Sequence, residues 1–465
     1  MKRGEIIQVT VEDLAPDGRG VAGQRPPIYI KGALPGEVVN ARLTRVRGGW
    51  AEALPESFIT RSKMRVRPRC LHFGVCGGCE WQNIAYEHQL DLKRRLVENH
   101  LRARMGSETP PIDRPLGSEQ IFFYRNKMEY SFERDEEGNL ILGLHHEGRY
   151  DRVFDLAQCY LQSEGSNAIV KDVREFARSH FLTPYSVISH EGLLRLLVIR
   201  EGKNTGETMV NLVTSSESFE GRDELVSLIM DNHPEVKSFI LTLNPGKASV
   251  SRGIKEIVLA GESRISEKID TLVLEMSAGS FFQPNPLQAR RLYDLILNFA
   301  QLDGDETVLD LYCGIGSITL YLARYARYVT GIELAPESVD DAQRNAELNG
   351  IDNCRFIQGE IGKALPYLVR GSEGIDLAVV DPPRPGIGRK VARWLGELSP
   401  NRIIYVSCNP RSLAEDLRDI CSFNYRIERV CPVDMFPHTC HIETVVKLTK
   451  SVPSPLSPRG TYGGG

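Results

Sequence analysis

The chain of 465 residues carries a formal net charge of −4, with 41% hydrophobic and 25% charged residues. This balance is typical of a globular protein and excludes a disordered chain, a collagen and a small disulfide-stapled scaffold. At roughly 100–200 residues per domain, the length predicts two or three domains. The apolar run Leu193–Ile199 is far shorter than the roughly 18 residues of a membrane-spanning helix, and no signal-like stretch follows Met1–Glu5. We therefore expect a cytoplasmic protein without membrane contact, whose cysteines stay reduced.

Residues 1–60 predict a small all-β unit. Apolar alternation at Glu5–Val11 and Val38–Val46, with turns such as Gly48-Gly49, indicates five short strands and a barrel of the OB type. Such a barrel either binds nucleic acid or is a structural appendage. Between positions 42 and 69, the only acidic residues are Glu52 and Glu56, whereas eight residues are basic: Arg42, Arg45, Arg47, Arg61, Lys63, Arg65, Arg67 and Arg69. These residues form either a face for a polyanion or an ordinary solvated charge run.

The middle of the chain predicts a helix followed by a mixed α+β segment. The apolar spacing over Tyr86–Arg104 is helical, and the linker Thr109-Pro110-Pro111 closes that helix. Residues 120–270 contain three predicted strands, Leu193–Arg200, Thr208–Val213 and Ser238–Leu243. The Ser-, Pro- and Gly-rich tail Ser451–Gly465 predicts disorder.

From about residue 284 onward, helices and strands alternate. Predicted strands at Val308–Leu311, Tyr328–Glu333, Cys354–Gln358, Leu377–Asp381 and Arg402–Ser407 are separated by helical segments. This order predicts a parallel, doubly wound α/β sheet, in which ligands bind at the carboxyl ends of the strands.

A nucleotide-type turn follows the first of these strands. Asp310–Ser317 places Gly314 and Gly316 between a strand and a helix, where glycines allow close approach to a ligand. Thr319 replaces the third glycine of a dinucleotide fingerprint, and Glu333 ends the next strand, where a carboxylate can accept ribose hydroxyls. This combination favours S-adenosylmethionine over NAD. The alternative is a tight turn with an unrelated surface glutamate.

Three later motifs carry the reactive side chains. Asp381 begins a proline-stiffened loop, Asp381–Gly386, after the fourth strand, and Cys408 follows the fifth strand as a candidate nucleophile. The alternative interpretation of Cys408 is an ordinary buried thiol. Glu443 is interpreted as a proton acceptor that faces the Cys408 edge. We do not favour a zinc site at His438 and His441, since no further ligands are evident nearby.

A cysteine cluster lies between the barrel and the helix. Cys70, Cys76 and Cys79 have C-x5-C-x2-C spacing, and Cys159 is a distant fourth thiol. Four thiolates hold either an iron–sulfur cluster or zinc. Iron–sulfur is favoured, since zinc sites more often use two CxxC knuckles and only one is present here.

These motifs resemble the RNA uracil-C5-methyltransferase family over roughly residues 1–450. The resemblance implies a multidomain fold: a TRAM barrel at 1–60, a central α+β domain at 61–81 and 115–272, and a class I methyltransferase domain at 82–114 and 273–450. Residues 451–465 remain a disordered tail. It also implies a [4Fe–4S] cluster on Cys70, Cys76, Cys79 and Cys159.

The resemblance further implies a S-adenosylmethionine pocket and two catalytic side chains. The cofactor-binding residues would be Gln283, Tyr312, Gly314, Ser317, Glu333, Glu360 and Asp381. Cys408 would be the nucleophile that adds to carbon 6 of uracil, because carbon 5 is too weak a nucleophile by itself. Glu443 would remove the carbon-5 proton so that the cysteine can leave.

RNA is the expected partner of a monomeric enzyme. The barrel and cysteine cluster resemble the branch that acts on 23S rRNA, with a tRNA T-loop uridine as the alternative. Three other classes of protein are the alternatives: a non-catalytic RNA-binding protein, a methyltransferase for protein or small molecules, and a redox enzyme. Cys408 and Glu443 argue against a non-catalytic RNA-binding protein, because such a protein would not need them. The barrel and the basic residues argue against a protein or small-molecule substrate, and the lack of a flavin or nicotinamide fingerprint argues against a redox enzyme.

Overall fold

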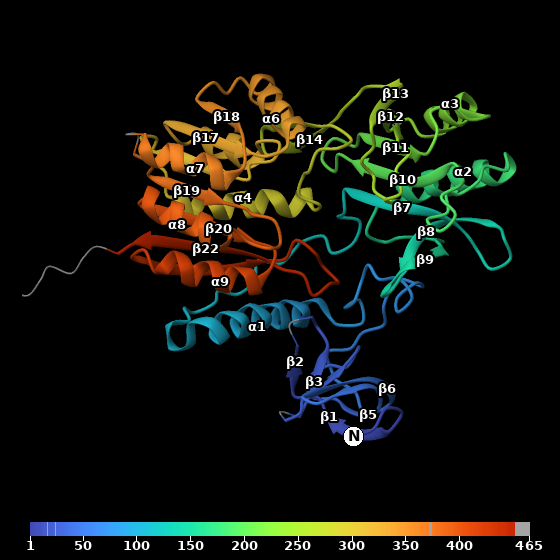
Figure 1. Cartoon of the computed structure of the whole chain (residues 1–465), viewed down its shortest axis with the longest axis horizontal. Coiled ribbons are helices and arrows are strands. Elements are labelled where there is room, and N and C mark those ends of the chain that lie inside the picture. Colours follow the sequence, from blue (N-terminus) through green and yellow to red (C-terminus); the bar gives the residue numbers. More distant parts are fainter. Residues whose placement is uncertain (16, 24, 372–373, 452–465) are drawn as a thin grey trace, which may run out of the picture.

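The computed structural model describes residues 1–15, 17–23, 25–371 and 374–451. The expected tail 451–465 therefore lies outside the described residues except for Ser451. Figure 1 shows three bodies: a small β unit at the N-terminus, a central α+β body and a larger C-terminal α/β body. In the described part of the chain, no helix combines the length and apolar character that crossing a membrane requires.

The N-terminal unit is one sheet in the order β1-β5-β6-β4-β3-β2. Its strands are β1 (Ile6–Thr10), β2 (Asp13–Leu14), β3 (Gly20–Ala22), β4 (Ile28–Ile30), β5 (Val38–Arg47) and β6 (Trp50–Thr60). The sheet thus has six strands and not the predicted five, because the two-residue strand β2 is too short to show alternation. The turn Gly48-Gly49 joins β5 to β6 as expected, with Arg47 paired to Trp50.

The central body is a seven-stranded sheet in the order β13-β12-β11-β10-β7-β8-β9. Its elements are β7 (Lys127–Arg134), β8 (Leu140–His146), β9 (Arg149–Asp155), α2 (Glu164–Ser179), β10 (Leu194–Glu201), β11 (Thr208–Thr214), α3 (Arg222–Asn232), β12 (Val236–Leu243) and β13 (Lys255–Gly261). The hairpin β14 (Ile265–Ile269) and β15 (Leu272–Met276) leads on to the C-terminal body.

The C-terminal sheet has the order β18-β17-β16-β19-β20-β22-β21. Its strands are β16 (Thr307–Leu311), β17 (Tyr328–Glu333), β18 (Cys354–Gln358), β19 (Leu377–Val380), β20 (Arg402–Ser407), β21 (Tyr425–Val433) and β22 (Glu443–Lys450). The first five strands in sheet order are parallel, as predicted. Two further strands that were not predicted, β22 and β21, extend the sheet at one edge and run antiparallel.

Helices cover both faces of this sheet (Figure 1). They are α1 (Tyr86–Met105) with the short 3-10 turn η1 (Gly106–Glu108), α4 (Pro286–Ala300), α5 (Ser317–Ala323), α6 (Pro336–Leu348), α7 (Ile361–Arg370), α8 (Gly388–Leu398) and α9 (Pro410–Cys421). Alternate strand residues point to opposite faces, so Val308 packs in one core and Leu309 in the other. Helix α1 joins the second core through Val97 and Leu101 and contacts α9. The domain boundaries expected from the sequence stay a prediction.

Candidate functional site

The turn after β16 is held in a conformation that suits a bound ligand. Tyr312, Gly314 and Gly316 all have positive φ, at 66°, 55° and 81°. A Cβ on Gly316 would lie 3.0 Å from the Phe356 ring, so this position requires glycine. The backbone N–H of Tyr312 donates to the carbonyl of Ile332 at 3.0 Å, which fixes the turn against β17.

Glu333 at the end of β17 is fixed beside this turn. Its Oε2 accepts the N–H of Gly314 at 3.1 Å, and its Oε1 accepts the N–H groups of Leu334 at 2.7 Å and Ala335 at 2.9 Å. Ser317 lies at the start of α5, and its hydroxyl accepts a hydrogen bond from the Tyr293 hydroxyl at 2.9 Å. The structure thus brings together Gly314 and Glu333, and it fixes the Ser317 hydroxyl at the start of the helix that follows the same turn.

Glu360 lies at the same sheet edge but is turned to another partner. It precedes α7, after β18, which is the neighbour of β17. Its exposed carboxylate pairs with Lys363 at 2.8 Å, and this hydrogen-bonded lysine lowers the pKa of Glu360. Among the expected cofactor residues, Glu360 is therefore the one whose carboxylate is already occupied by a neighbouring cation.

Gln283 and Asp381 meet although 98 positions separate them. The Gln283 amide donates from Nε2 to Asp381 Oδ2 at 3.3 Å. Asp381 follows β19, and its N–H donates to the Leu311 carbonyl at 3.3 Å, which ties it to the strand that carries the glycine turn. Burial raises the pKa of the Asp381 carboxyl.

Cys408 and Glu443 lie at the ends of neighbouring antiparallel strands. The last pair of β20 and β22 joins Ser407 to Thr444, so Cys408 and Glu443 are the next facing positions. Cys408 is half-buried and Glu443 is 5% exposed. Within the described residues, Glu443 Oε2 is buried without a hydrogen-bond partner.

The charged groups around Cys408 have opposite effects on the pKa of its thiol. Burial, followed by the carboxyls of Glu443 and Asp381, raises the pKa of the Cys408 thiol to about 12, while Arg384 opposes this rise. Burial, and then the nearby Asp381, raises the pKa of Glu443, again opposed by Arg384. One thiol, two carboxyls and one guanidinium therefore influence one another at this site.

The loop that carries Arg384 is tied directly to the Cys408 turn. The Arg384 carbonyl accepts hydrogen bonds from Asn409 Nδ2 at 2.9 Å and from the Ser412 hydroxyl at 3.0 Å. The Arg384 guanidinium lies 3.5 Å from His441 Nδ1. The sequence analysis gave neither Arg384 nor His441 a catalytic role, because only the folded chain places both near Cys408.

The four expected metal-ligating cysteines line one cavity. Cys70, Cys76, Cys79 and Cys159 surround it together with His72 and Gln82. Burial, with the neighbouring thiols adding to it, raises the pKa of Cys76 to about 11 and of Cys79 to about 12. In the described chain, however, no three His, Cys, Asp or Glu side chains already have the close arrangement of a metal centre.

Two open cavities adjoin the site. The barrel groove, of about 620 Å³, is lined by barrel residues and by the Cys408 turn, including Arg19, Tyr29, Trp50, Arg384, Cys408 and Arg411. The guanidinium of Arg19 lies 4.9 Å from the Tyr29 ring centroid. The segment 70–79, which contains Cys70, Cys76 and Cys79, is called the cysteine loop. The central groove, of about 660 Å³, runs from this loop to Phe282 and Pro284, which lie on either side of Gln283 in the chain.

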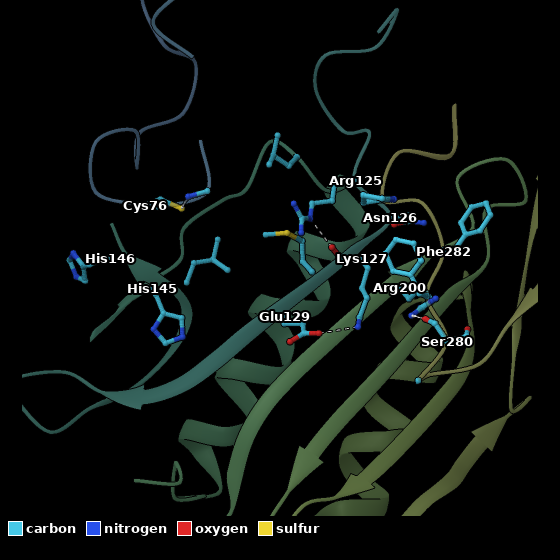
Figure 2. A pocket seen from close by; sticks show the side chains of 18 residues that line it. Cys76, Arg125, Asn126, Lys127, Glu129, His145, His146, Arg200, Ser280 and Phe282 are labelled. Carbon is cyan, nitrogen blue, oxygen red and sulfur yellow. Dashed lines mark hydrogen bonds and ion pairs between the residues drawn. The ribbon is translucent and has the colours of Figure 1, made fainter. Parts of the chain in front are cut away.

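Figure 2 shows the cations that line the central groove. Arg125 Nε donates to the Lys127 carbonyl at 2.9 Å, Lys127 Nζ pairs with Glu129 at 2.9 Å, and Arg200 donates to the Ser280 carbonyl at 2.5 Å. Three cations therefore face one carboxylate in this cavity, so its charge suits an anionic ligand.

The comparisons with known proteins agree with this architecture. The family model of tRNA (uracil-5-)-methyltransferases matches residues 255–451, and that of the TRAM domain matches residues 1–54. A chain named as an uncharacterized RNA methyltransferase from Halalkalibacterium halodurans is 40% identical over 96% of this chain and 98% of its own length. One from Clostridium acetobutylicum is 38% identical over 97% of this chain and 99% of its own length.

A solved structure extends the likeness to three dimensions. The tRNA (uracil-54, C5)-methyltransferase of Pyrococcus abyssi, in complex with S-adenosyl-L-homocysteine, matches with a TM-score of 0.76 and 27% identity. The match covers 95% of this chain and 100% of that one. The chain accordingly belongs to the RNA (uracil-5-)-methyltransferase family, as a S-adenosylmethionine-dependent RNA methyltransferase with an N-terminal TRAM domain.

Proposed function

We propose that the protein methylates carbon 5 of a uridine in RNA through a covalent bond between Cys408 Sγ and carbon 6 of the base. The observation that carries this proposal is the facing placement of Cys408 and Glu443 beside Asp381. A nucleophile and a proton acceptor held as neighbours in one small site are what the two halves of the reaction require.

The residues have separate tasks in this mechanism. The Cys408 thiolate adds to carbon 6, and the electrons of the 5,6 double bond move toward the carbonyl at carbon 4, which makes carbon 5 nucleophilic. S-adenosylmethionine, when bound, would supply the electrophilic methyl group: the new bond to carbon 5 would form as the sulfonium–methyl bond breaks, and S-adenosylhomocysteine would leave. The Glu443 carboxylate then removes the carbon-5 proton, the 5,6 double bond re-forms, and the thiolate leaves carbon 6.

The cofactor pocket is proposed to be the edge formed by the glycine turn and the neighbouring strand ends. Tyr312, Gly314 and Ser317 would line it, with Glu333 accepting hydrogen bonds from ribose hydroxyls. Gln283 would line the cofactor pocket and Asp381 would lie between cofactor and target base, and their hydrogen bond at 3.3 Å supports placing the two residues in one site. The pairing of Glu360 with Lys363 favours a lesser role for Glu360.

The RNA is proposed to approach through the barrel groove and the central groove. The barrel groove contains Cys408 itself, and its arginines and aromatic rings suit phosphates and unstacked bases. The central groove contributes Arg125, Lys127 and Arg200 beside the Gln283 segment. The target base must leave its stack to reach Cys408, which RNA-modifying enzymes achieve by flipping it.

We propose 23S rRNA as the substrate, on the resemblance to the rRNA branch. A tRNA T-loop uridine is the second candidate, favoured by the likeness to the tRNA (uracil-54, C5)-methyltransferase of Pyrococcus abyssi. Mapping 5-methyluridine in total RNA with and without the gene tests both. Loss of a 23S rRNA site is the expected result, loss of a T-loop site supports the second candidate, and loss of neither overturns both.

We also propose a [4Fe–4S] cluster on Cys70, Cys76, Cys79 and Cys159. The residues fit, because all four thiols line one cavity, and burial, with the neighbouring thiols adding to it, raises the pKa of Cys76 and Cys79, as expected of thiols that need a bound cation to become thiolates. The cluster would hold the cysteine loop to the central body and supply no electron to the reaction. Iron and acid-labile sulfide in the purified protein would support it, whereas stoichiometric zinc without iron would contradict it.

A further inference from the structure

The segment 434–442, which we call the Glu443 loop, connects β21 to the candidate base at the start of β22. His438 in this loop has a φ of 70°, a left-handed conformation that is strained for a side chain of this size. Glu443 Oε2 has no hydrogen-bond partner among the described residues. The direction of the Glu443 side chain therefore depends on how firmly the loop is packed.

Helix α1 holds the centre of the loop through Gln89. The buried Gln89 amide accepts the His438 N–H at Oε1, 2.9 Å away. Its Nε2 lies 3.2 Å from His438 Nδ1 and donates to the Trp81 and Ile84 carbonyls at 3.0 and 2.8 Å. One side chain thus binds the loop and the segment after Cys79 together.

A buried ion pair holds the beginning of the loop. Lys93 Nζ and Asp434 Oδ1 are 2.6 Å apart, and both side chains are 0% exposed. The same ammonium donates to the Phe436 carbonyl at 3.0 Å, and the Tyr86 hydroxyl donates to Asp434 at 2.9 Å. Helix α1 therefore contacts the loop at both 434–436 and 438.

The segment after Cys79 holds the end of the loop. The N–H groups of Glu80 and Trp81 both donate to the His438 carbonyl, at 3.0 and 2.9 Å. The exposed Glu80 carboxylate accepts the Cys440 N–H at 3.0 Å, three residues before Glu443. These contacts tie the candidate base to the cysteine loop without touching Cys408.

The Cys408 turn is held by a different set of bonds. Asn409 N donates to the Ser407 hydroxyl at 3.2 Å, and the Asn409 amide donates to the Arg384 carbonyl. Neither Gln89, Glu80 nor Lys93 takes part in these bonds. The Glu443 loop does approach the Arg384 guanidinium through His441, at 3.5 Å, but the Cys408 turn is held by the Arg384 carbonyl. A disturbance of the Glu443 loop should therefore reach the base and spare the nucleophile.

We propose that Gln89, Glu80 and Lys93 are positioning residues that align Glu443 for the release step, an inference that rests on the proposed function. In that step the carboxylate takes the carbon-5 proton, the electrons of that carbon–hydrogen bond restore the 5,6 double bond, and the carbon–sulfur bond breaks with its electrons returning to Cys408. Loss of these contacts slows release about 10- to 100-fold, as small misplacements of a reacting group do, and leaves adduct formation unchanged.

Single-turnover reactions on RNA from cells that lack the gene, sampled on denaturing gels, separate adduct formation from adduct decay. The variants are Gln89→Met and the surface change Glu80→Ala, with Glu80→Gln as the rescue because its amide oxygen still accepts the Cys440 N–H. All reactions use saturating RNA, because Glu80 also lines the barrel groove and its replacement could otherwise act through RNA binding. Glu98→Gln, elsewhere on α1, is the matched control, and thermal melting checks that each variant folds. We expect adduct to accumulate in Glu80→Ala and Gln89→Met but not in Glu80→Gln or Glu98→Gln.

Parallel reactions of Glu443→Gln distinguish the possible failures. If Glu443→Gln accumulates adduct while Glu80→Ala and Gln89→Met change neither step, or slow both steps equally, the positioning inference is wrong and the proposed function stands. If Glu443→Gln accumulates no adduct, the proposed role of Glu443 fails and the inference fails with it.

Discussion

Cys408 and Glu443 lie at facing positions of β20 and β22, one step beyond the pair formed by Ser407 and Thr444. The antiparallel pairing brings together two side chains that lie 35 positions apart in the chain (443 − 408). It also places an ionisable carboxyl where it raises the pKa of the thiol. The two candidate catalytic residues are therefore coupled electrostatically as well as by register.

Replacing Glu443 by glutamine should shift the pH dependence of adduct formation to lower pH. The pKa of Cys408 is raised first by burial and then by Glu443, so removing this negative charge lowers the thiol pKa and gives more thiolate at a given pH. Quenched single-turnover reactions across a pH series measure the shift. A profile that stays in place, or moves to higher pH, would contradict the coupling.

Replacing Arg384 by glutamine should have the opposite effect. The Arg384 guanidinium lowers the pKa of both Cys408 and Glu443, so its loss raises both and moves the rise of activity to higher pH. Arg384→Lys keeps the charge and serves as the control. The assay uses saturating RNA, so that weaker RNA binding does not imitate the effect; equal pH profiles for the glutamine and lysine variants would refute it.

Replacing Glu333 by glutamine should weaken S-adenosylmethionine binding by roughly 10- to 100-fold, the usual value of a hydrogen bond to a charged group. Glu360→Gln is the matched comparison, since its carboxylate already pairs with Lys363, and its effect should be smaller. Isothermal titration calorimetry without RNA measures both. A larger loss for Glu360→Gln would mean that the cofactor pocket is assigned to the wrong strand end.

Replacing Lys93 by methionine should destabilise the C-terminal body by about 3–5 kcal/mol, because Asp434 would remain buried without its cation. Arg102→Met on the same helix breaks only the exposed pair with Glu98 and should cost less than about 1 kcal/mol. Urea unfolding monitored by circular dichroism compares the two. Equal midpoints for the two variants would show that the buried pair adds no stability.

The sequence predicted the helices and parallel strands of the C-terminal body because their apolar spacing is regular and their turns contain glycine. It did not predict the antiparallel edge: β22 is buried at six consecutive positions, so no alternation reveals its direction. The strand β7 does carry a strand signal, the alternation of Met128, Tyr130 and Phe132 with polar residues, although the sequence prediction did not include it.

The candidate site shows the same limit. Motifs at strand ends were sufficient to select Asp381 and Cys408, since their place in a parallel sheet follows from topology. The contact of Gln283 with Asp381 depends on tertiary packing, which spacing does not encode. Lys93 did carry a signal, as a charged residue among the apolar positions Leu92, Leu96 and Val97, but its partner Asp434 lies 341 positions later.

Mass spectrometry of the denatured Glu443→Gln protein, after incubation with S-adenosylmethionine and RNA from cells that lack the gene, tests the covalent mechanism most directly. The account predicts a methylated uridine nucleotide attached to the peptide that contains Cys408, and no such product in the Cys408→Ala variant. Attachment to another residue, or normal uridine methylation by Cys408→Ala, would contradict it.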